Sequence, residues 1–338
     1  CTGVYVSKNP LGPYTCMSGA PFAIKAGGFI KGAGHGHPFK DRYGNDWYVA
    51  TIVVASKEHY ERRVGIFPAF YKDGYAHAIT EYMDFPFILP DKKVDFSQHD
   101  VSAGMNLLSY NKQMKASSSL GVHQAKMATD EDIRTWWSAA SGKRGEWLQM
   151  DLSKPMELSA LQISFSDEGF KTYRHDKNVP VYQYIVEGSL NGTDWQLLAD
   201  RSQNTKDQIY ELIVLDKKIK TQFVRIKNTK DFATGYFSIA DIRLFGNAKG
   251  KVPKQVSNFI VERNKDRRRI AFTWDKQPTA EGYVIRWGAS PEHIDNAIMV
   301  YDNQAEFGFF DRNIAYYMTI EAFNESGKSK SSTPIKIN

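Results

Sequence analysis

Cysteine is almost absent from this chain, whose 338 residues include only Cys1 and Cys16. Two cysteines could pair, but they cannot form a disulfide framework, which excludes the heavily cross-linked class of small folds. No apolar run approaches the ~18–20 residues that cross a bilayer, so we expect no membrane span. The opening "CTGVYVSKN" has no Met, no charged stretch and no apolar leader. We therefore expect this sequence to be the C-terminal part of a longer protein.

Charge of one sign is not concentrated anywhere in the chain. The 44 Lys and Arg residues exceed the 38 Asp and Glu residues by six. The tightest basic cluster, Arg267 to Arg269, lies between two strand-like runs and is typical of a solvated turn. Nucleic-acid binding requires a concentrated basic face, so we expect no nucleic-acid partner.

Helical periodicity is also scarce, and what is present is typical of strands. Short runs rich in Val, Ile, Tyr, Phe and Trp are bounded by Gly, Pro, Asn and Asp, which predicts an all-β architecture. These runs include "DWYVATIVVA", "ALQISF", "YQYIVEGS", "FVRIKN", "RIAFTW" and "GYVIRWG". Polar stretches with proline at 89–104 and 246–255 divide the chain into segments 1–95, 100–247 and 252–338.

The middle segment contains the most specific set of ordered motifs. "ATDEDIRTWWS" (128–138) is followed by "GEWLQMDLSKPMELSALQISF", "YQYIVEGSLNGTDWQLL" and "FSIADIRLFG". Together these resemble the discoidin, or coagulation-factor type C, domain, which is also the fold of family 32 carbohydrate-binding modules. The resemblance implies a jelly-roll β-sandwich that binds carbohydrate.

The "TDEDIRT" loop places several oxygen donors within one turn, as a Ca²⁺ ion requires. In the discoidin family this loop binds calcium with an acidic residue near the last strand, so the resemblance implies a structural Ca²⁺ held by Asp130, Asp132, Thr135 and Asp241. Glu131 stands where the family usually has Gly. The alternative is an acidic turn without an ion.

A second loop of the middle segment, "DEGFKTYRHDKN" (167–178), offers hydrogen-bonding groups and an aromatic ring at one rim, as sugar binding requires. By resemblance to related modules we predict that the sugar contacts Tyr173, Arg174, His175 and Asn178, with Phe232 and Tyr236 from "DFATGYFS". The alternative is a generic exposed loop. Trp137, Trp147 and Trp195 are predicted to be core residues.

The last segment contains an early strand with Trp274, then "GYVIRWG", then "AYYMTIEAFNESGKS". This order resembles a fibronectin type III domain, an immunoglobulin-like β-sandwich that usually spaces or docks other domains. We find no chemical constellation in it, and its role cannot be read from the motifs.

The first segment has an unusual run, "GAGHGHPF" (32–39), ahead of "KDRYGNDWYVA". The order "YVSKNPLGPY", "GHG", "D-x-x-G-x-x-W-Y", an Arg and "DG" resembles the last blade and a quarter of the five-bladed β-propeller of glycoside hydrolase family 43. The resemblance implies that His35 faces a central channel and helps to hold an ion through water. The alternative is a hydrogen-bonded histidine without metal. Arg63, or its neighbour Arg62, would line the substrate pocket.

The family resemblance also implies a function for the parent protein. Inverting hydrolysis uses two carboxyl groups, which in the family come from earlier blades. We therefore predict the C-terminal portion of a secreted, periplasmic or cell-surface glycoside hydrolase of the arabinosidase or xylosidase type, acting on plant polysaccharide. This chain itself should be inactive without the missing blades. The alternative is a non-catalytic glycan-binding or adhesion protein, and a lipid or receptor ligand is a third option.

Overall fold

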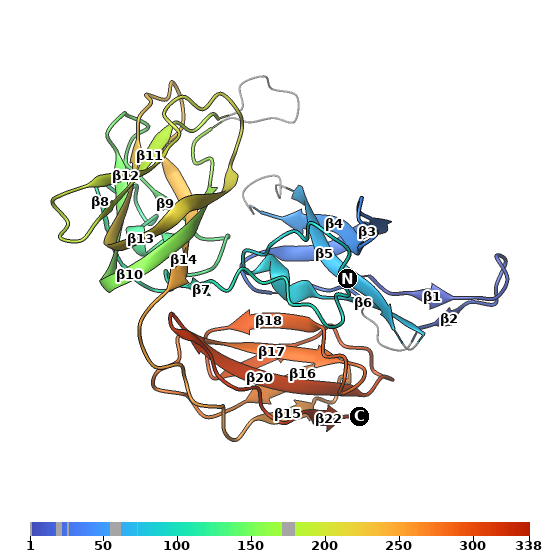
Figure 1. Ribbon diagram of the computed structural model, residues 1–338. Coiled ribbons are helices and arrows are strands. Elements are labelled where there is room, and N and C mark those ends of the chain that lie inside the picture. The colour runs from blue at the N-terminus through green and yellow to red at the C-terminus, as the bar shows by residue number, and fades with distance from the viewer. Residues whose placement is uncertain (1, 18–21, 26, 55–61, 73, 171–179) are drawn as a thin grey trace. The chain divides into compact units, whose positions relative to one another are not determined.

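The computed structural model describes residues 2–17, 22–25, 27–54, 62–72, 74–170 and 180–338 (Figure 1). The chain divides into two compact units. Unit 1 consists of Cys1–Val53, Arg62–Gly104 and Lys251–Asn338, and unit 2 of Val54–Glu61 and Met105–Gly250. Across these described ranges every long element is a strand, and the only helices are two short 3₁₀ turns. The all-β prediction is therefore confirmed.

The N-terminal part of unit 1 contains a four-stranded antiparallel sheet whose strands pair in chain order. They are β3 (Lys31–Lys40), β4 (Asp46–Val53), β5 (Arg62–Lys72) and β6 (Tyr75–Ala78). A short hairpin, β1 (Tyr5–Val6) with β2 (Thr15–Cys16), precedes the sheet, and the 3₁₀ helix η1 (Thr80–Met83) follows it. The strand β4 thus lies within the predicted run "DWYVATIVVA" and ends at Val53.

The turn between β3 and β4 explains the "D-x-x-G-x-x-W-Y" motif. The Asp41 carboxylate accepts hydrogen bonds from the backbone of Tyr43 and Asn45, from the Asn45 amide and from Trp47 Nε1 at 3.0 Å. Slight burial opposes the effect, but the hydrogen bonds from Asn45 and Trp47 lower the pKa of Asp41 to about 2. The motif therefore fixes Trp47, which packs with Phe70 in a small core.

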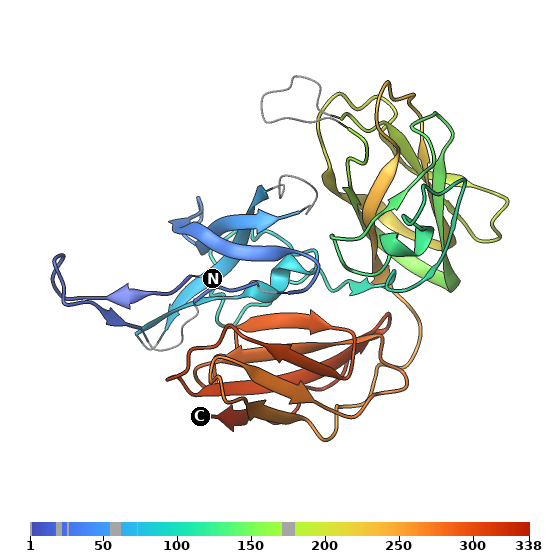
Figure 2. The same cartoon turned by 180° about the vertical axis from the view of Figure 1, so that it is seen from behind.

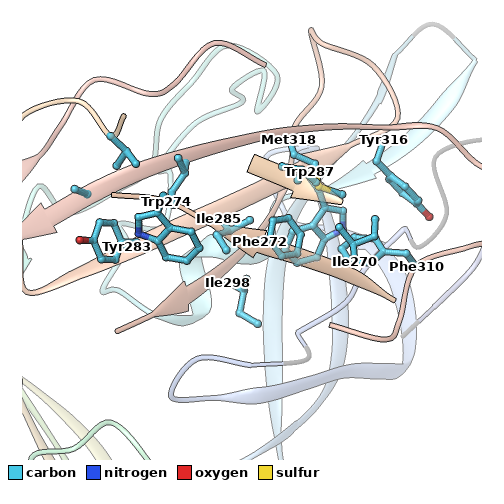
Figure 3. Packing of buried hydrophobic residues seen from close by; sticks show 14 of the residues in the cluster. Ile270, Phe272, Trp274, Tyr283, Ile285, Trp287, Ile298, Phe310, Tyr316 and Met318 are labelled. Carbon is cyan, nitrogen blue, oxygen red and sulfur yellow. The ribbon is translucent and has the colours of Figure 1, made fainter. Parts of the chain in front are cut away.

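The C-terminal part of unit 1 is a sandwich of two antiparallel sheets. One sheet has the order β15 (Ile260–Arg263), β16 (Ile270–Thr273), β19 (Gln304–Phe307). The other has the order β18 (Asn296–Val300), β17 (Gly282–Gly288), β20 (Tyr316–Asn324), β21 (Gly327–Lys328), with β22 (Ile335–Ile337) also paired to β20. Inward-facing residues such as Phe272, Trp287 and Met318 fill the space between the sheets (Figure 3).

Within unit 1 the two parts are joined by buried contacts. Ile24 belongs to the core of the sandwich. Glu81 in η1 accepts two hydrogen bonds from Arg286 in β17, at 2.5 and 2.7 Å, and is also paired with Lys328. Burial alone would raise the pKa of Glu81, but the charges of Arg286 and Lys328 lower it well below its usual range. These ion pairs fix η1 against β17.

Unit 2 contains nine elements around one continuous sheet, seen from both sides in Figures 1 and 2. In chain order they are β7 (Asn106–Leu107), β8 (Gln113–Ala116), η2 (Ala125–Ala128), β9 (Trp137–Ser138), β10 (Trp147–Phe165), β11 (Tyr184–Ser189), β12 (Gln196–Asp200), β13 (Tyr210–Asn228) and β14 (Ser238–Asn247). The main path of the sheet is β12-β11-β13-β10-β14-β7.

The long strands β10 and β13 close this sheet into a sandwich because each serves two layers. The first part of β10, up to Asp151, pairs with β8, whereas the part from Glu157 onward pairs with β14. Irregularities between Asp151 and Met156, and between Leu158 and Ala160, bend the strand where its partner changes. Bulges of this kind allow a strand to turn a corner between sheets.

Candidate functional site

A histidine, a tryptophan and a glutamate meet at one rim of unit 2. The His123 ring stacks on the Trp136 ring, with centroids 4.4 Å apart and planes inclined by 18°. Trp136 Nε1 donates a hydrogen bond to Glu168 Oε2 at 3.0 Å, and His123 Nε2 lies 4.0 Å from the same oxygen. The His123 and Glu168 side chains are 23% and 20% exposed. We call these three residues the rim cluster.

The loop that carries Glu168 is packed against the loop before β14. The Tyr236 backbone N–H donates to the Glu168 carbonyl at 2.9 Å. Gly169 has a φ of +72°, and a Cβ there would lie 2.7 Å from the Tyr236 ring, so this position requires glycine. Phe170 meets Phe232 edge to face at 5.2 Å. The packing therefore fixes the rim cluster beside two half-buried aromatic rings.

This loop pair contains two of the six residues that the sequence predicts as sugar contacts. Phe232 and Tyr236 lie next to Glu168 and Phe170, as described. Tyr173, Arg174, His175 and Asn178 fall in 171–179, outside the described residues. Their contribution to the site stays a prediction.

Sequence reasoning missed the rim cluster itself. The signal was present in "TWWS", because consecutive side chains of an extended segment face opposite sides. Trp137 is fully buried, whereas Trp136 is half-buried and reaches the rim. His123 stands alone in a polar loop, and its position beside Trp136 depends on tertiary packing that no local pattern reports.

Two of the three tryptophans predicted as core are not core. Trp137 is confirmed, with an exposed fraction of 0%. Trp147 and Trp195 are half-buried. The Arg225 guanidinium lies 3.9 Å from the centre of the Trp195 ring, so this tryptophan covers a charged group instead of filling the interior.

The acidic loop predicted to bind calcium contributes Glu131, whose buried carboxylate interacts with that of Asp241; we call these two groups the buried pair. The Glu131 backbone N–H donates to Asp241 Oδ2 at 3.0 Å, and Arg243 Nε donates to Glu131 Oε1 at 2.7 Å. Asp241 Oδ1 and Glu131 Oε2 are buried and accept no hydrogen bond from any residue in the described part of the chain. Burial, followed by the charge of Glu131, raises the pKa of Asp241 well above its usual range.

These donors fit a hard cation only in part. Asp130, Glu131 and Asp241 supply carboxylate oxygens, and Thr135 donates to Asp130 Oδ2 at 2.7 Å, which keeps that carboxylate in place. The Asp132 carboxylate instead binds Arg134, with Nη2 to Oδ2 at 2.6 Å. The Asp132 carboxylate is thus shared with Arg134, whereas the Glu131 carboxylate, which the resemblance does not include, belongs to the buried pair.

The residues predicted from the propeller resemblance lie on the sheet of unit 1. His35 is exposed on β3, which pairs only with β4 among the described strands. Its φ of +50° places it in the left-handed region, within the run of glycines. His35 and His37 both line a shallow cavity of about 370 Å³. Arg63 is half-buried on β5, opposite Ile52 of β4.

One comparison with known protein families supports the class of unit 2. The family model of the F5/8 type C domain matches residues 113–242, which confirms the predicted discoidin-like character of the middle segment. No curated protein matches the chain. The described residues contain no helix that is both long and apolar enough to span a membrane.

Several solved structures resemble this part of the chain. One is CpGH89CBM32-4 of Clostridium perfringens in complex with glcNAc-alpha-1,4-galactose, at 21% identity, covering 44% of this chain and 99% of that one, with a TM-score of 0.36. Another is the family 32 CBM from NanJ of C. perfringens in complex with galactose, at 18% identity, 42% and 98% coverage, and a TM-score of 0.35. A third is a family 89 glycoside hydrolase from the same organism, at 23% identity, 43% and 15% coverage, and a TM-score of 0.35.

Proposed function

We propose that unit 2 is a carbohydrate-binding module and that its sugar binds at the rim cluster. The observation that carries this proposal is the stack of His123 on Trp136, with Glu168 hydrogen-bonded at its edge, in a domain of the F5/8 type C family. An aromatic face packs against the C–H face of a sugar ring, and imidazole and carboxylate groups bind its hydroxyls. Arg174 and Asn178, which the resemblance implies as sugar contacts, lie outside the described residues, and their contribution is part of this proposal.

We further propose that the chain is a C-terminal portion of a secreted glycoside hydrolase of the family 43 type, with the rim cluster holding the enzyme on its polysaccharide. The ordered motifs of residues 1–95 support this, and so does the antiparallel sheet β3–β6, since a propeller blade has four strands. The arrangement β15-β16-β19 against β18-β17-β20 supports a fibronectin type III domain at 252–338.

We also propose that a Ca²⁺ ion stabilises unit 2 at Asp130, Glu131 and Asp241. The two buried carboxylate oxygens that lack a hydrogen bond from the described residues support this, because such atoms need a donor or a cation. An ion near His35 in the parent propeller is a separate proposal. A single imidazole is a poor site for a hard cation, so water or other blades would supply the other ligands.

Isothermal titration of the full chain against a sugar panel tests the binding proposal. The panel includes galactose, N-acetylglucosamine, xylo-oligosaccharides and arabino-oligosaccharides. Binding of at least one sugar should be lost in Trp136→Ala and weakened at least tenfold in His123→Ala. Trp195→Ala is the matched control, because Trp195 is a half-buried tryptophan of the same domain that contacts Arg225. Equal binding by Trp136→Ala and the native chain would refute the assignment of the rim cluster.

A further inference from the structure

Two histidines and an aspartate meet inside unit 1, next to Phe70 and η1. His77 lies on β6, and His293 and Asp295 lie in the loop that joins β17 to β18. One ligand atom from each of the three lies within 4.8 Å of the others. His77 Nδ1 is 2.8 Å from Asp295 Oδ2, and these two side chains are only 13% and 19% exposed.

Two neighbouring rings contact the His77 ring. Phe70 stacks on it at 4.7 Å with planes inclined by 9°, and the His293 ring centre lies 4.4 Å from its own. His77 Nε2 is buried and forms no hydrogen bond with any residue in the described part of the chain. Leaving a buried polar atom unsatisfied costs about 1–3 kcal/mol, so this nitrogen favours a partner other than the described residues.

Backbone contacts hold the two segments of the cluster together. The Thr80 N–H donates to the Asp295 carbonyl at 3.3 Å, and the Ala297 N–H donates to Thr80 Oγ1 at the same distance. Glu81, the residue after Thr80, forms an ion pair with Arg286 of β17. The three side chains therefore project from a fixed framework, as a metal site requires.

The cluster opens onto a cavity of about 560 Å³. Phe22, Tyr75 and Asn313 also line this cavity, which is large enough to hold water molecules. Two imidazoles and one carboxylate are the ligands of zinc and similar first-row ions, whereas Ca²⁺ and Mg²⁺ prefer oxygen alone. A site with three protein ligands and an open position is completed by solvent.

We propose that His77, His293 and Asp295 bind a divalent transition-metal ion of the zinc type, with water from the cavity as a further ligand. Bonds of about 2 Å place the ligand atoms of a tetrahedral site roughly 3.3 Å apart. The ligand atoms of the three residues now lie within 4.8 Å of one another, so side-chain rotation would bring the most distant pair closer by up to roughly 1.5 Å. The bound ion would link β6 to the loop before β18. This proposal is independent of sugar binding by unit 2.

The test is a titration of the full chain carrying Cys16→Ser, because Cys16 is an exposed thiol and thiolates are zinc ligands that would compete for the ion. After chelation, Zn²⁺ is added in a calorimeter and Co²⁺ in a spectrophotometer. We expect one site per chain that is lost in His77→Gln and weakened roughly 10–100-fold or more in Asp295→Asn. The double variant His35→Gln/His37→Gln is the control, because those exposed histidines offer a competing site, and it should bind as before.

X-ray absorption of the zinc-loaded chain gives a second readout that needs no variant. It should report two imidazole ligands, together with oxygen ligands. Hydrogen exchange of residues 75–78 should slow when zinc is added. Unchanged affinity in His77→Gln, loss of the site in the His35/His37 variant, or one imidazole or none in the absorption spectrum would each overturn the proposal.

Discussion

Removal of the Arg243 guanidinium tests the electrostatics of unit 2 most directly. Arg243 is 1% exposed, and it donates to Glu131 Oε1 at 2.7 Å and to Gln162 Oε1 at 3.2 Å. Arg243→Met keeps most of the apolar stem but leaves Glu131 and Asp241 without this cation. Breaking a buried ion pair by removing one partner costs about 3–5 kcal/mol. We expect the local stability of unit 2 to fall by that amount.

A double variant separates the effect of the ion pair on stability from the effect of side-chain packing. Arg243→Met/Glu131→Gln removes both charges and keeps the shape of the glutamate. Replacing both members of a buried pair is often close to neutral, so the double variant should regain most of the stability that the single variant loses. The coupling between the two positions is then the measured quantity.

The matched control is Arg225→Met on β13 of the same unit. Arg225 binds Glu187 at 3.0 and 2.8 Å, but these side chains are 21% and 18% exposed. A partly solvated pair contributes about 1 kcal/mol or less, so this control should lose far less stability than Arg243→Met.

Hydrogen exchange of the full chain, followed by mass spectrometry on peptides from β10 and β14, measures these changes. A loss of about 3–5 kcal/mol corresponds to exchange that is faster by roughly two to three and a half orders of magnitude. Exchange in Arg243→Met that matches Arg225→Met, or a double variant no more stable than the single one, would refute the reasoning.

The same variant has a pH dependence of known sign. The pKa of Asp241 is raised in the folded chain by burial and by Glu131. A raised carboxyl pKa favours folding below its ordinary value of 3.8, and this contribution is lost as the pH rises through the folded value. Arg243 opposes the rise, so the penalty of Arg243→Met should be larger at neutral pH than in acid.

Three other predictions concern unit 1, the calcium proposal and catalysis. Glu81→Gln should destabilise unit 1 by about 3 kcal/mol, because Arg286 and Lys328 lose their shared partner. The pKa of Glu81 is lowered in the folded chain. The difference in stability from the native chain, measured by urea unfolding, should therefore shrink as the pH falls below 4.5. Ca²⁺ at a hundred times its dissociation constant should stabilise unit 2 by about 2.7 kcal/mol in thermal unfolding, and Asp241→Asn should abolish this gain; no gain in the native chain would contradict the site. The chain should not turn over aryl arabinosides or xylosides, and measurable release of the aryl group would contradict the prediction that the catalytic acids lie outside this chain.

Particular residues show which features of the structure the sequence alone predicts. It determined the strand runs, because alternating β-branched and aromatic residues bounded by turn formers define strands by local sterics and burial. "GYVIRWG" became β17 with its predicted ends, and the Asp-rich loop and Asp241 came together as expected. The Asp132 carboxylate also binds the nearby Arg134, and its role as a calcium ligand stays a prediction.

Tertiary structure alone decided which distant side chains meet. Trp136 and Trp137 are chemically identical neighbours, and only the packing of the segment that leads into β9 sends one ring toward His123 and the other into the core. His77 and Asp295 are 218 residues apart, and no local pattern relates them. Strand formation depends on near neighbours in the chain, whereas a site depends on the packing of whole sheets, so the first can be read from the sequence and the second cannot.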